Sequence, residues 1–390
     1  MYNGLKLNIN RITPSNILGN LSVILIIVGF YFYLIAEIVF DSFSFRPAFL
    51  FLAYIFFLLN IFITGKIKID HQLFFYLSVS LIIYAISSPF WLVPYDINVY
   101  LSAITAIVII NNYEFFLKAI KVFIFCTLLL AFYEFVTKEY LFVVERQTYL
   151  GFRRLDEVFF GGLSGIFRAK VYFEGPLALS QFAIGAALLF RNNLKLLYAI
   201  LLISIFANGR LGIVVCVGVI ALYYFKRYDI GSFILKPKTL LIILTSFISV
   251  IVLFFSVLDK ASIERLTEAF NTSNKGNSDR IQFWIDGFKM LMHTDLTHLI
   301  FGNNGKFESV YNNNAENGWL TLLLNNGIVG FVYYFIPIIL IIIVSIKKTP
   351  MDVFYIFLFI FCMFVQTFHL GASANLFYWL IVFSFLKPHK

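Results

Sequence analysis

Residues 315–330 read Ala-Glu-Asn-Gly-Trp-Leu-Thr-Leu-Leu-Leu-Asn-Asn-Gly-Ile-Val-Gly, and this stretch decides the fold. The carboxylate of Glu316 precedes an apolar segment, and Asn325-Asn326-Gly327 interrupts that segment before it continues. Polar side chains and breaks in a helix are costly in lipid, so they usually line a cavity within a membrane protein. The stretch therefore predicts a membrane helix that is broken close to a polar site.

The preceding residues, 259–316, contain no long apolar run and predict a polar loop that holds one helix. Asp279 can cap this helix, with Gln282 three residues later. Apolar side chains then recur at helical spacing and form one stripe, namely Ile281, Trp284, Ile285, Phe288 and Met292. Arg280 lies at the edge of this stripe, so we expect it to point toward the membrane body.

The composition is that of a polytopic membrane protein. Of the 390 residues, 61% are hydrophobic and 13% are charged, and the 49 Phe and 22 Tyr suit lipid-facing and interfacial surfaces. The three cysteines fall in apolar runs and predict neither a disulfide framework nor a metal site. We expect one integral membrane unit over residues 1–390, without a cleavable signal peptide.

The apolar runs predict an all-α fold with about twelve membrane-spanning helices, at ~20 residues per crossing. They lie near residues 17–40, 47–65, 72–92, 97–112, 116–136, 175–190, 194–208, 211–225, 239–257, 317–346, 351–369 and 372–386. Two long loops remain on one side, residues 137–174 and 259–316, and the second is partly helical. Lysines and arginines gather in the short connections on the opposite side, so we expect both termini in the cytoplasm.

Arg210 is the most informative single residue, because it separates two short apolar runs within Asn208-Gly209-Arg210-Leu211-Gly212. An arginine at membrane depth costs roughly 2.5–3.5 kcal/mol on insertion scales, so such residues are usually paired or functional. A guanidinium group matches phosphate oxygens with a bidentate fork. The alternative is an arginine whose side chain extends to the outer headgroups.

The first long loop holds further candidates. Arg153, Arg154 and Arg168 lie among apolar residues, which is typical of a loop folded onto the membrane, although a solvated surface is the alternative for each. Glu174 precedes Gly175-Pro176 at a helix start. Its carboxylate could orient an arginine or bind a substrate hydroxyl, or it could simply complement the helix dipole.

Glu316 could act as a general base, although the same dipole argument applies to it. The sequence contains no His-Glu-x-x-His motif, no Asp-x-Asp pair and no Walker-type glycine loop. We therefore expect no metal, no cofactor and no nucleic-acid partner.

In the order and spacing of its motifs, the chain resembles the O-antigen ligase/polymerase superfamily, in particular the bacterial oligosaccharide repeat-unit polymerases. The resemblance covers roughly residues 145–345. It rests on short motifs within a membrane plan: Glu174-Gly175-Pro176, the 208–212 motif, Arg280 with Trp284, Gly302 and Gly305 with Phe307, Glu316-Asn317 with Leu320, and residues 326–330.

The resemblance implies a metal-independent glycosyltransferase with a GT-C-like plan, whose active site lies on the periplasmic face of the bacterial inner membrane. Its substrates would be sugars on undecaprenyl diphosphate, embedded in membrane lipids, and a chain-length regulator is a further partner that it allows. The family's membrane-level arginine falls on Arg210 and its loop arginine on Arg280. By their chemistry, these arginines could stabilise the leaving diphosphate and Glu316 could activate the acceptor hydroxyl as a base. We expect the residues that bind the substrate to be Arg153, Arg154, Arg168, Glu174 and Asn317.

Two other functions stay open. Ligases, which transfer the polymer to lipid A–core, typically carry His-Asn where this chain has Glu316-Asn317, and this difference favours a polymerase. A flippase of lipid-linked sugars would share the spans and the membrane-level arginine. The long outer loops and the lack of a paired internal repeat disfavour a flippase, and the outer arginines disfavour a purely structural scaffold.

Overall fold

The computed structural model describes residues 14–32, 35, 46–67, 71–93, 97–143, 145–148, 151–154, 167–227, 275–368 and 374–386. In its first half the helices are α1 (Pro14–Tyr31), α3 (Arg46–Thr64), α4 (His71–Ser87), the short 3-10 helix η1 (Ser88–Phe90), α5 (Ile97–Asn111) and α6 (Tyr113–Thr137). The later helices are α8 (Pro176–Leu189), α9 (Leu194–Phe206), α10 (Arg210–Arg227), α14 (Lys275–Met292), α15 (Leu296–Phe301), α16 (Lys306–Tyr311), α17 (Gly318–Lys348), α18 (Asp352–Val365) and α19 (Asn375–Leu386).

The prediction of a helical membrane protein agrees with these elements. In the described part of the chain, four helices are long and apolar enough to cross a membrane: Pro47–Thr64, His71–Phe90, Tyr113–Thr137 and Gly318–Lys347. Six shorter apolar helices accompany them. The predicted span 239–257 lies outside the described residues, and a total of twelve crossings stays a prediction.

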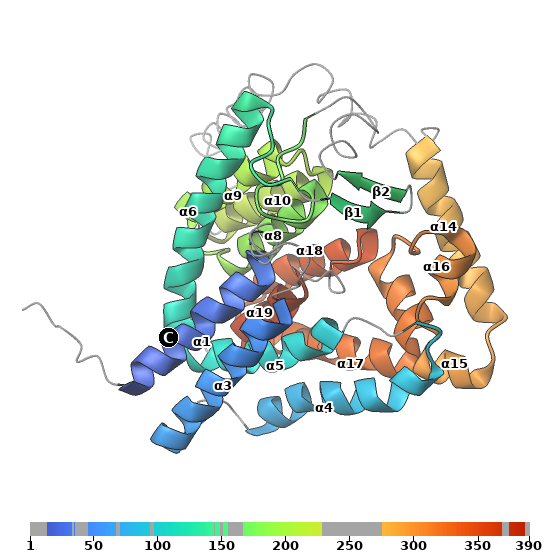
Figure 1. Cartoon of the computed structure of the whole chain (residues 1–390), viewed down its shortest axis with the longest axis horizontal. Coiled ribbons are helices and arrows are strands. Elements are labelled where there is room, and N and C mark those ends of the chain that lie inside the picture. Colours follow the sequence, from blue (N-terminus) through green and yellow to red (C-terminus); the bar gives the residue numbers. More distant parts are fainter. Residues whose placement is uncertain are drawn as a thin grey trace, which may run out of the picture.

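A small hairpin departs from the all-α expectation. Strand β1 (Glu145–Thr148) pairs antiparallel with β2 (Gly151–Arg154), so that Arg146 lies opposite Arg153. The hairpin falls in the predicted first long loop, and Figure 1 places it on the side of the helices that faces α14. The sequence of this segment indicates no regular structure, because four-residue strands carry little periodicity.

Small residues bring α8, α9 and α10 into close contact near the centre of the molecule (Figure 1). A Cβ atom at Gly209 would lie 2.2 Å from Ser180 Oγ, and one at Gly212 would lie 2.5 Å from the same atom. Small residues commonly allow such close approach between membrane helices. This packing holds the turn between α9 and α10 against α8.

The ends of several helices that were predicted to face the cytoplasm lie together. Lys226 Nζ, at the end of α10, is 2.8 Å from Asp352 Oδ1 at the start of α18. Arg191, 2% exposed beyond the end of α8, donates to Ser384 Oγ in α19 at 2.9 Å. These contacts agree with a position of the four helix ends on the same side of the membrane. That this side is the cytoplasmic one stays a prediction.

Helix α17 is broken where the Asn-Asn-Gly motif predicted. Gly327 has φ +64° and ψ −167°, which no helix residue adopts. The break is occupied by backbone from the turn after α15, because Asn303 N donates to Leu324 O at 2.9 Å. The second loop therefore docks at the break. The Leu324 carbonyl, which the break frees from the helix, is hydrogen-bonded by Asn303.

Two glycines make this docking possible. A Cβ at Gly327 would lie 2.3 Å from Ile300 O, and a Cβ at Gly302, where φ is +82°, would lie 2.2 Å from Asn325 O. On the other side of the same turn, Trp91 Nε1 donates to Phe301 O at 3.0 Å. The turn is thus clamped between α17 and the segment that follows η1.

Helix α14 begins at Lys275, so the predicted start at Arg280, after a cap at Asp279, is wrong by five residues. Its polar face is as expected, since Gln282 Nε2 donates to Asp286 Oδ1 at 3.0 Å. Most of the predicted apolar stripe is exposed, however, namely Ile281, Ile285, Phe288 and Met292. Trp284 is the exception, and packs with Phe283, Met290 and Leu291 against a small core around Phe307 and Leu320.

The clamp predicts the effect of Gly327→Ala. Alanine at this position would take a backbone conformation (φ +64°, ψ −167°) that is almost exclusive to glycine, at about 1–3 kcal/mol, and would also clash with Ile300 O. Gly65 also has a positive φ, +65°, with nothing within 4 Å of its Cβ position, so Gly65→Ala is the control for a glycine at positive φ without a clash. Thermal unfolding in detergent should show a clearly larger loss for Gly327→Ala, and equal losses would contradict the clamp.

Candidate functional site

The structure brings together Arg280 and Glu316, which are 36 residues apart. Arg280 Nε donates to Glu316 Oε2, and Asn313 Nδ2 donates to Glu316 Oε1 at 3.1 Å. The backbone of Glu316 is left-handed, with φ +50°, and its N–H donates to Asn314 Oδ1 at 2.7 Å. Both carboxylate oxygens are therefore engaged, and the side chain is held just before α17.

Asn317, and not Glu316, caps α17. Its Oδ1 atom accepts hydrogen bonds from the N–H groups of Trp319 and Leu320, each at 3.1 Å. A capping asparagine satisfies backbone donors at a helix start. This contact accounts for Asn317 structurally, and its role in substrate binding stays a prediction.

The Arg280–Glu316 pair is accessible, because the two side chains are 41% and 29% exposed. Exposed ion pairs contribute only about 0–1 kcal/mol to folding stability. The pair is thus a weak structural contact that an anionic ligand can reach. Such a position suits a guanidinium group that exchanges one anionic partner for another.

Arg168 and Arg210 lie at a second place, the turn between α9 and α10. Arg210 is the first residue of α10 and is half-buried. Arg168 Nε donates to Ala207 O at 3.3 Å, and Ala169 N donates to Phe206 O at 3.0 Å. The end of the first loop is therefore bound to the turn that presents Arg210.

Asn208 and Ser180 leave polar atoms unsatisfied beside this turn. Asn208 is 1% exposed and has φ +45°, and neither its Oδ1 nor its Nδ2 has a hydrogen-bond partner. Ser180 Oγ, 1% exposed as a residue, is likewise unpartnered. A buried polar group without a partner costs about 1–3 kcal/mol. The turn is thus a polar niche next to Arg210, which the sequence marked only by an Asn-Gly pair.

The other predicted site residues are less informative. Glu174 is exposed and precedes Gly175, the N-cap of α8, with Pro176 in the first turn as the sequence predicted. Arg153 and Arg154 lie in strand β2, and their side chains fall outside the part of the structure that is described.

Glu134 is a structural residue that the sequence analysis missed. It is fully buried near the end of α6. Its carboxylate accepts hydrogen bonds from the backbone N–H groups of Leu141 at 3.0 Å, Lys170 at 2.9 Å and Val171 at 2.8 Å. A carboxylate inside a predicted span was the available signal, because such groups are expensive in lipid.

The expectation of a loop folded onto the membrane stays a prediction over residues 155–166, which lie outside the described part of the chain, but the end of the loop does not lie on a surface. Residues 169–173 are buried among the helices instead, and Lys170 itself is fully buried, with its ammonium group donating to Phe142 O. Val171 has φ +52°, a rare conformation for a β-branched residue, and the Glu134 carboxylate holds its N–H. Glu134 therefore sets the path of the chain toward Arg168.

Among the described residues, no group of three or more His, Cys, Asp or Glu side chains could hold a metal ion. Comparison of the chain with protein-family models, curated proteins and solved structures finds no match.

The role of Glu134 predicts the outcome of Glu134→Gln. The amide can accept through only one of its two terminal atoms, so at least one buried N–H loses its partner, at a cost of about 1–3 kcal/mol. Thermal unfolding should show this loss, and limited proteolysis should cut faster near residues 167–173. Glu139→Gln, an exposed change just beyond α6, is the control and should leave both measurements unchanged.

Proposed function

We propose that the chain is a membrane glycosyltransferase that polymerises oligosaccharide repeat units carried on undecaprenyl diphosphate. In this proposal the growing chain leaves its lipid diphosphate and joins the non-reducing end of a new lipid-linked unit, on the periplasmic face of the bacterial inner membrane. The observation that carries the proposal is the accessible Arg280–Glu316 pair beside the start of a broken, apolar helix.

The chemistry needs a group that stabilises the leaving diphosphate. The bond between the anomeric carbon and the phosphate oxygen breaks, and its electron pair stays on the diphosphate. The acceptor hydroxyl oxygen bonds to the same carbon and loses its proton to a base. Arginines that are already in position stabilise the charge of the transition state more than they stabilise the ground state. This difference lowers the barrier. Arg280 and Arg210 are the residues that we assign to this role.

Glu316 has two successive roles in the proposal. Without substrate, its carboxylate holds Arg280, as the ion pair indicates. A bound diphosphate carries more charge than one carboxylate, so it competes for the guanidinium group. Once Arg280 turns to the diphosphate, Glu316 Oε2 becomes available to accept the proton of the acceptor hydroxyl.

The polar niche beside Arg210 supports a second contact with the diphosphate or its sugar. Asn208 presents both a donor and an acceptor that are unsatisfied within the protein. A ligand that supplied these hydrogen bonds would remove the cost of leaving them unmade. The apolar surfaces of the spans would hold the polyprenyl tails among the membrane lipids, and a chain-length regulator could bind the outer loops.

The first test is a polymerisation assay in the presence of EDTA. Purified protein is incubated with undecaprenyl-diphosphate repeat units from the same strain, and the products are separated on a gel. A ladder spaced by one repeat unit is the expected result. Product formed only after lipid A–core is added would indicate a ligase, and substrate movement across liposomes without a new bond would indicate a flippase.

Arg210→Ala and Arg280→Ala should each reduce the polymerisation rate by about 10²–10³-fold, the usual loss for one stabilising donor. Arg227→Ala is the matched control, because Arg227 is an exposed arginine at the opposite end of the same helix as Arg210. It should leave the rate unchanged. Normal polymer from either test variant would remove the leaving-group role from that arginine.

Glu316→Gln separates the two roles of Glu316. The amide oxygen can still accept from Arg280, while the proton acceptor is lost, so the rate should fall by about 10²–10⁴-fold with little change in KM. A rise in KM at an unchanged kcat would show that Glu316 contributes only to substrate binding and would remove its role as the base.

A further inference from the structure

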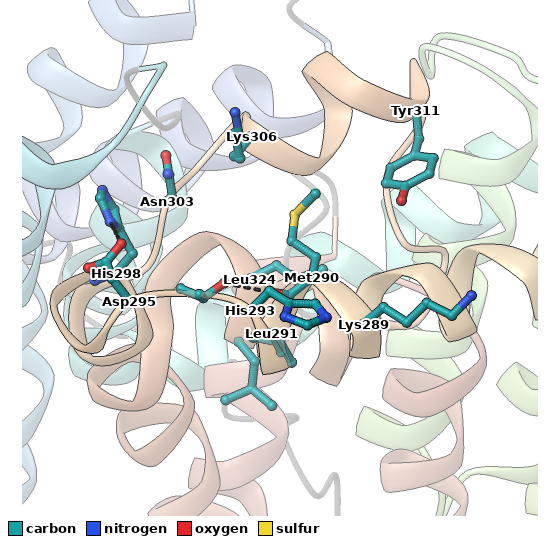
Figure 2. A pocket seen from close by; sticks show the side chains of 12 residues that line it. Lys289, Met290, Leu291, His293, Asp295, His298, Asn303, Lys306, Tyr311 and Leu324 are labelled. Carbon is teal, nitrogen blue, oxygen red and sulfur yellow. Dashed lines mark hydrogen bonds and ion pairs between the residues drawn. The ribbon is translucent and has the colours of Figure 1, made fainter.

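A pocket of about 370 Å³ lies in the second loop, between the end of α14, helices α15 and α16, and α17. Its size is within the range of small-ligand sites. Lys289, His293, His298, Lys306, Tyr311 and Asp295 supply its charged and aromatic groups. In Figure 2, Met290, Leu291 and Leu324 lie between these side chains, and Lys289 and Lys306 extend toward opposite sides of the pocket.

The only carboxylate among the lining residues is already engaged. Asp295 Oδ1 caps α15 by accepting from Thr297 N at 3.0 Å and His298 N at 3.1 Å. Asp295 Oδ2 is 2.5 Å from His298 Nδ1, and this hydrogen bond holds the pKa of Asp295 below its usual value. Both carboxylate oxygens of Asp295 are therefore already hydrogen-bonded, one to the start of α15 and the other to His298.

The two lysines remain available to a ligand. Lys289 makes one long contact of 3.7 Å with Asp286 and is 65% exposed. Lys306 is exposed and forms no ion pair with any residue that the structure describes. Lysine side chains are long and flexible, so both ammonium groups can turn toward an anion in the pocket. The pocket thus has excess positive charge.

Tyr311 adds a surface of a different kind. Its ring is half-buried and rests on Phe307, with ring centroids 4.5 Å apart, which fixes its orientation. Figure 2 shows the ring across the pocket from His293, on the side toward which Lys289 extends. An aromatic ring with a polar tip offers an apolar face to a ligand that carries hydroxyl groups at its edges.

We propose that this pocket binds an anionic sugar residue of the saccharide substrate, with its carboxylate or phosphate against Lys289 and Lys306 and its ring against Tyr311. That the ligand is a saccharide rests on the proposed function, whereas the preference for an anion rests on the pocket alone. The site is separate from the Arg280–Glu316 pair, because Lys289 lies nine residues, about 13 Å of helix, beyond Arg280.

The test is direct binding to the full-length protein in detergent, measured by saturation-transfer NMR and titration. The probes are methyl glucuronide, glucose 6-phosphate, inorganic phosphate and neutral methyl glucoside. The variants are Lys289→Gln, Lys306→Gln and Tyr311→Ala. Lys347→Gln, an exposed lysine near the far end of α17, is the matched control.

Both charged sugars should bind more tightly than methyl glucoside, and added salt should weaken their binding. Each lysine variant should weaken binding by about tenfold, the usual effect of one hydrogen bond to a charged group, and Lys347→Gln should not. Tyr311→Ala should weaken the binding of the sugars and leave the binding of inorganic phosphate unchanged. A stronger response to glucuronide than to glucose 6-phosphate would identify the carboxylate as the natural charge, and the reverse would identify the phosphate.

Equal binding of the neutral and charged sugars would overturn the role of charge. Inorganic phosphate binding as tightly as glucose 6-phosphate would overturn the role of the sugar, and no binding of any probe would overturn the site. Because no bond forms in this measurement, its result is independent of polymerisation. Protein that binds charged sugars but makes no polymer would remove the proposed function and leave the anionic-sugar site intact.

Discussion

The contact between the turn at Gly302 and the break at Gly327 is the constraint on which the rest of the second loop depends. A broken helix in an apolar environment must find partners for its backbone, and here Asn303 N meets Leu324 O. The contact is so close that neither glycine could carry a Cβ atom. One interaction therefore ends the first part of α17, anchors α15, and helps to shape the pocket between α14, α15, α16 and α17.

The first loop follows the same physical rule with a different partner. The turn at Gly302 meets backbone, whereas Lys170 and Val171 meet the buried carboxylate of Glu134. This carboxylate accepts their two N–H groups and that of Leu141. Each of these loops is thus fixed to the helices by hydrogen bonds to buried polar groups. A buried polar group without a partner is costly, so these contacts hold the loops in place. Arg168 follows an anchor that plays no part in the proposed chemistry, whereas Arg280 is held by Glu316, the residue that we propose as the base.

Parts of the candidate site were visible in the sequence, and parts were not. Arg210, Arg280 and Glu316 stood out because charged residues beside apolar runs are costly, and the structure pairs two of them. Asn208 was read as part of a turn, yet its burial without partners depends on how α8, α9 and α10 pack. The capping role of Asn317 depends on where α17 begins, a boundary that composition defines poorly.

The sequence by itself determined that the chain is built of apolar helices, that one of them breaks at Asn325-Asn326-Gly327, and that Arg168 and Arg280 lie outside the apolar runs. These properties are local, because hydrophobic runs and glycine conformations act over a few residues. Only the tertiary structure decided which polar groups meet: Arg280 with Glu316, Glu134 with Lys170, and Gly302 with Gly327. Such partners lie 25 or more residues apart in the sequence, and they are chosen by the packing of the helices, which no local pattern records.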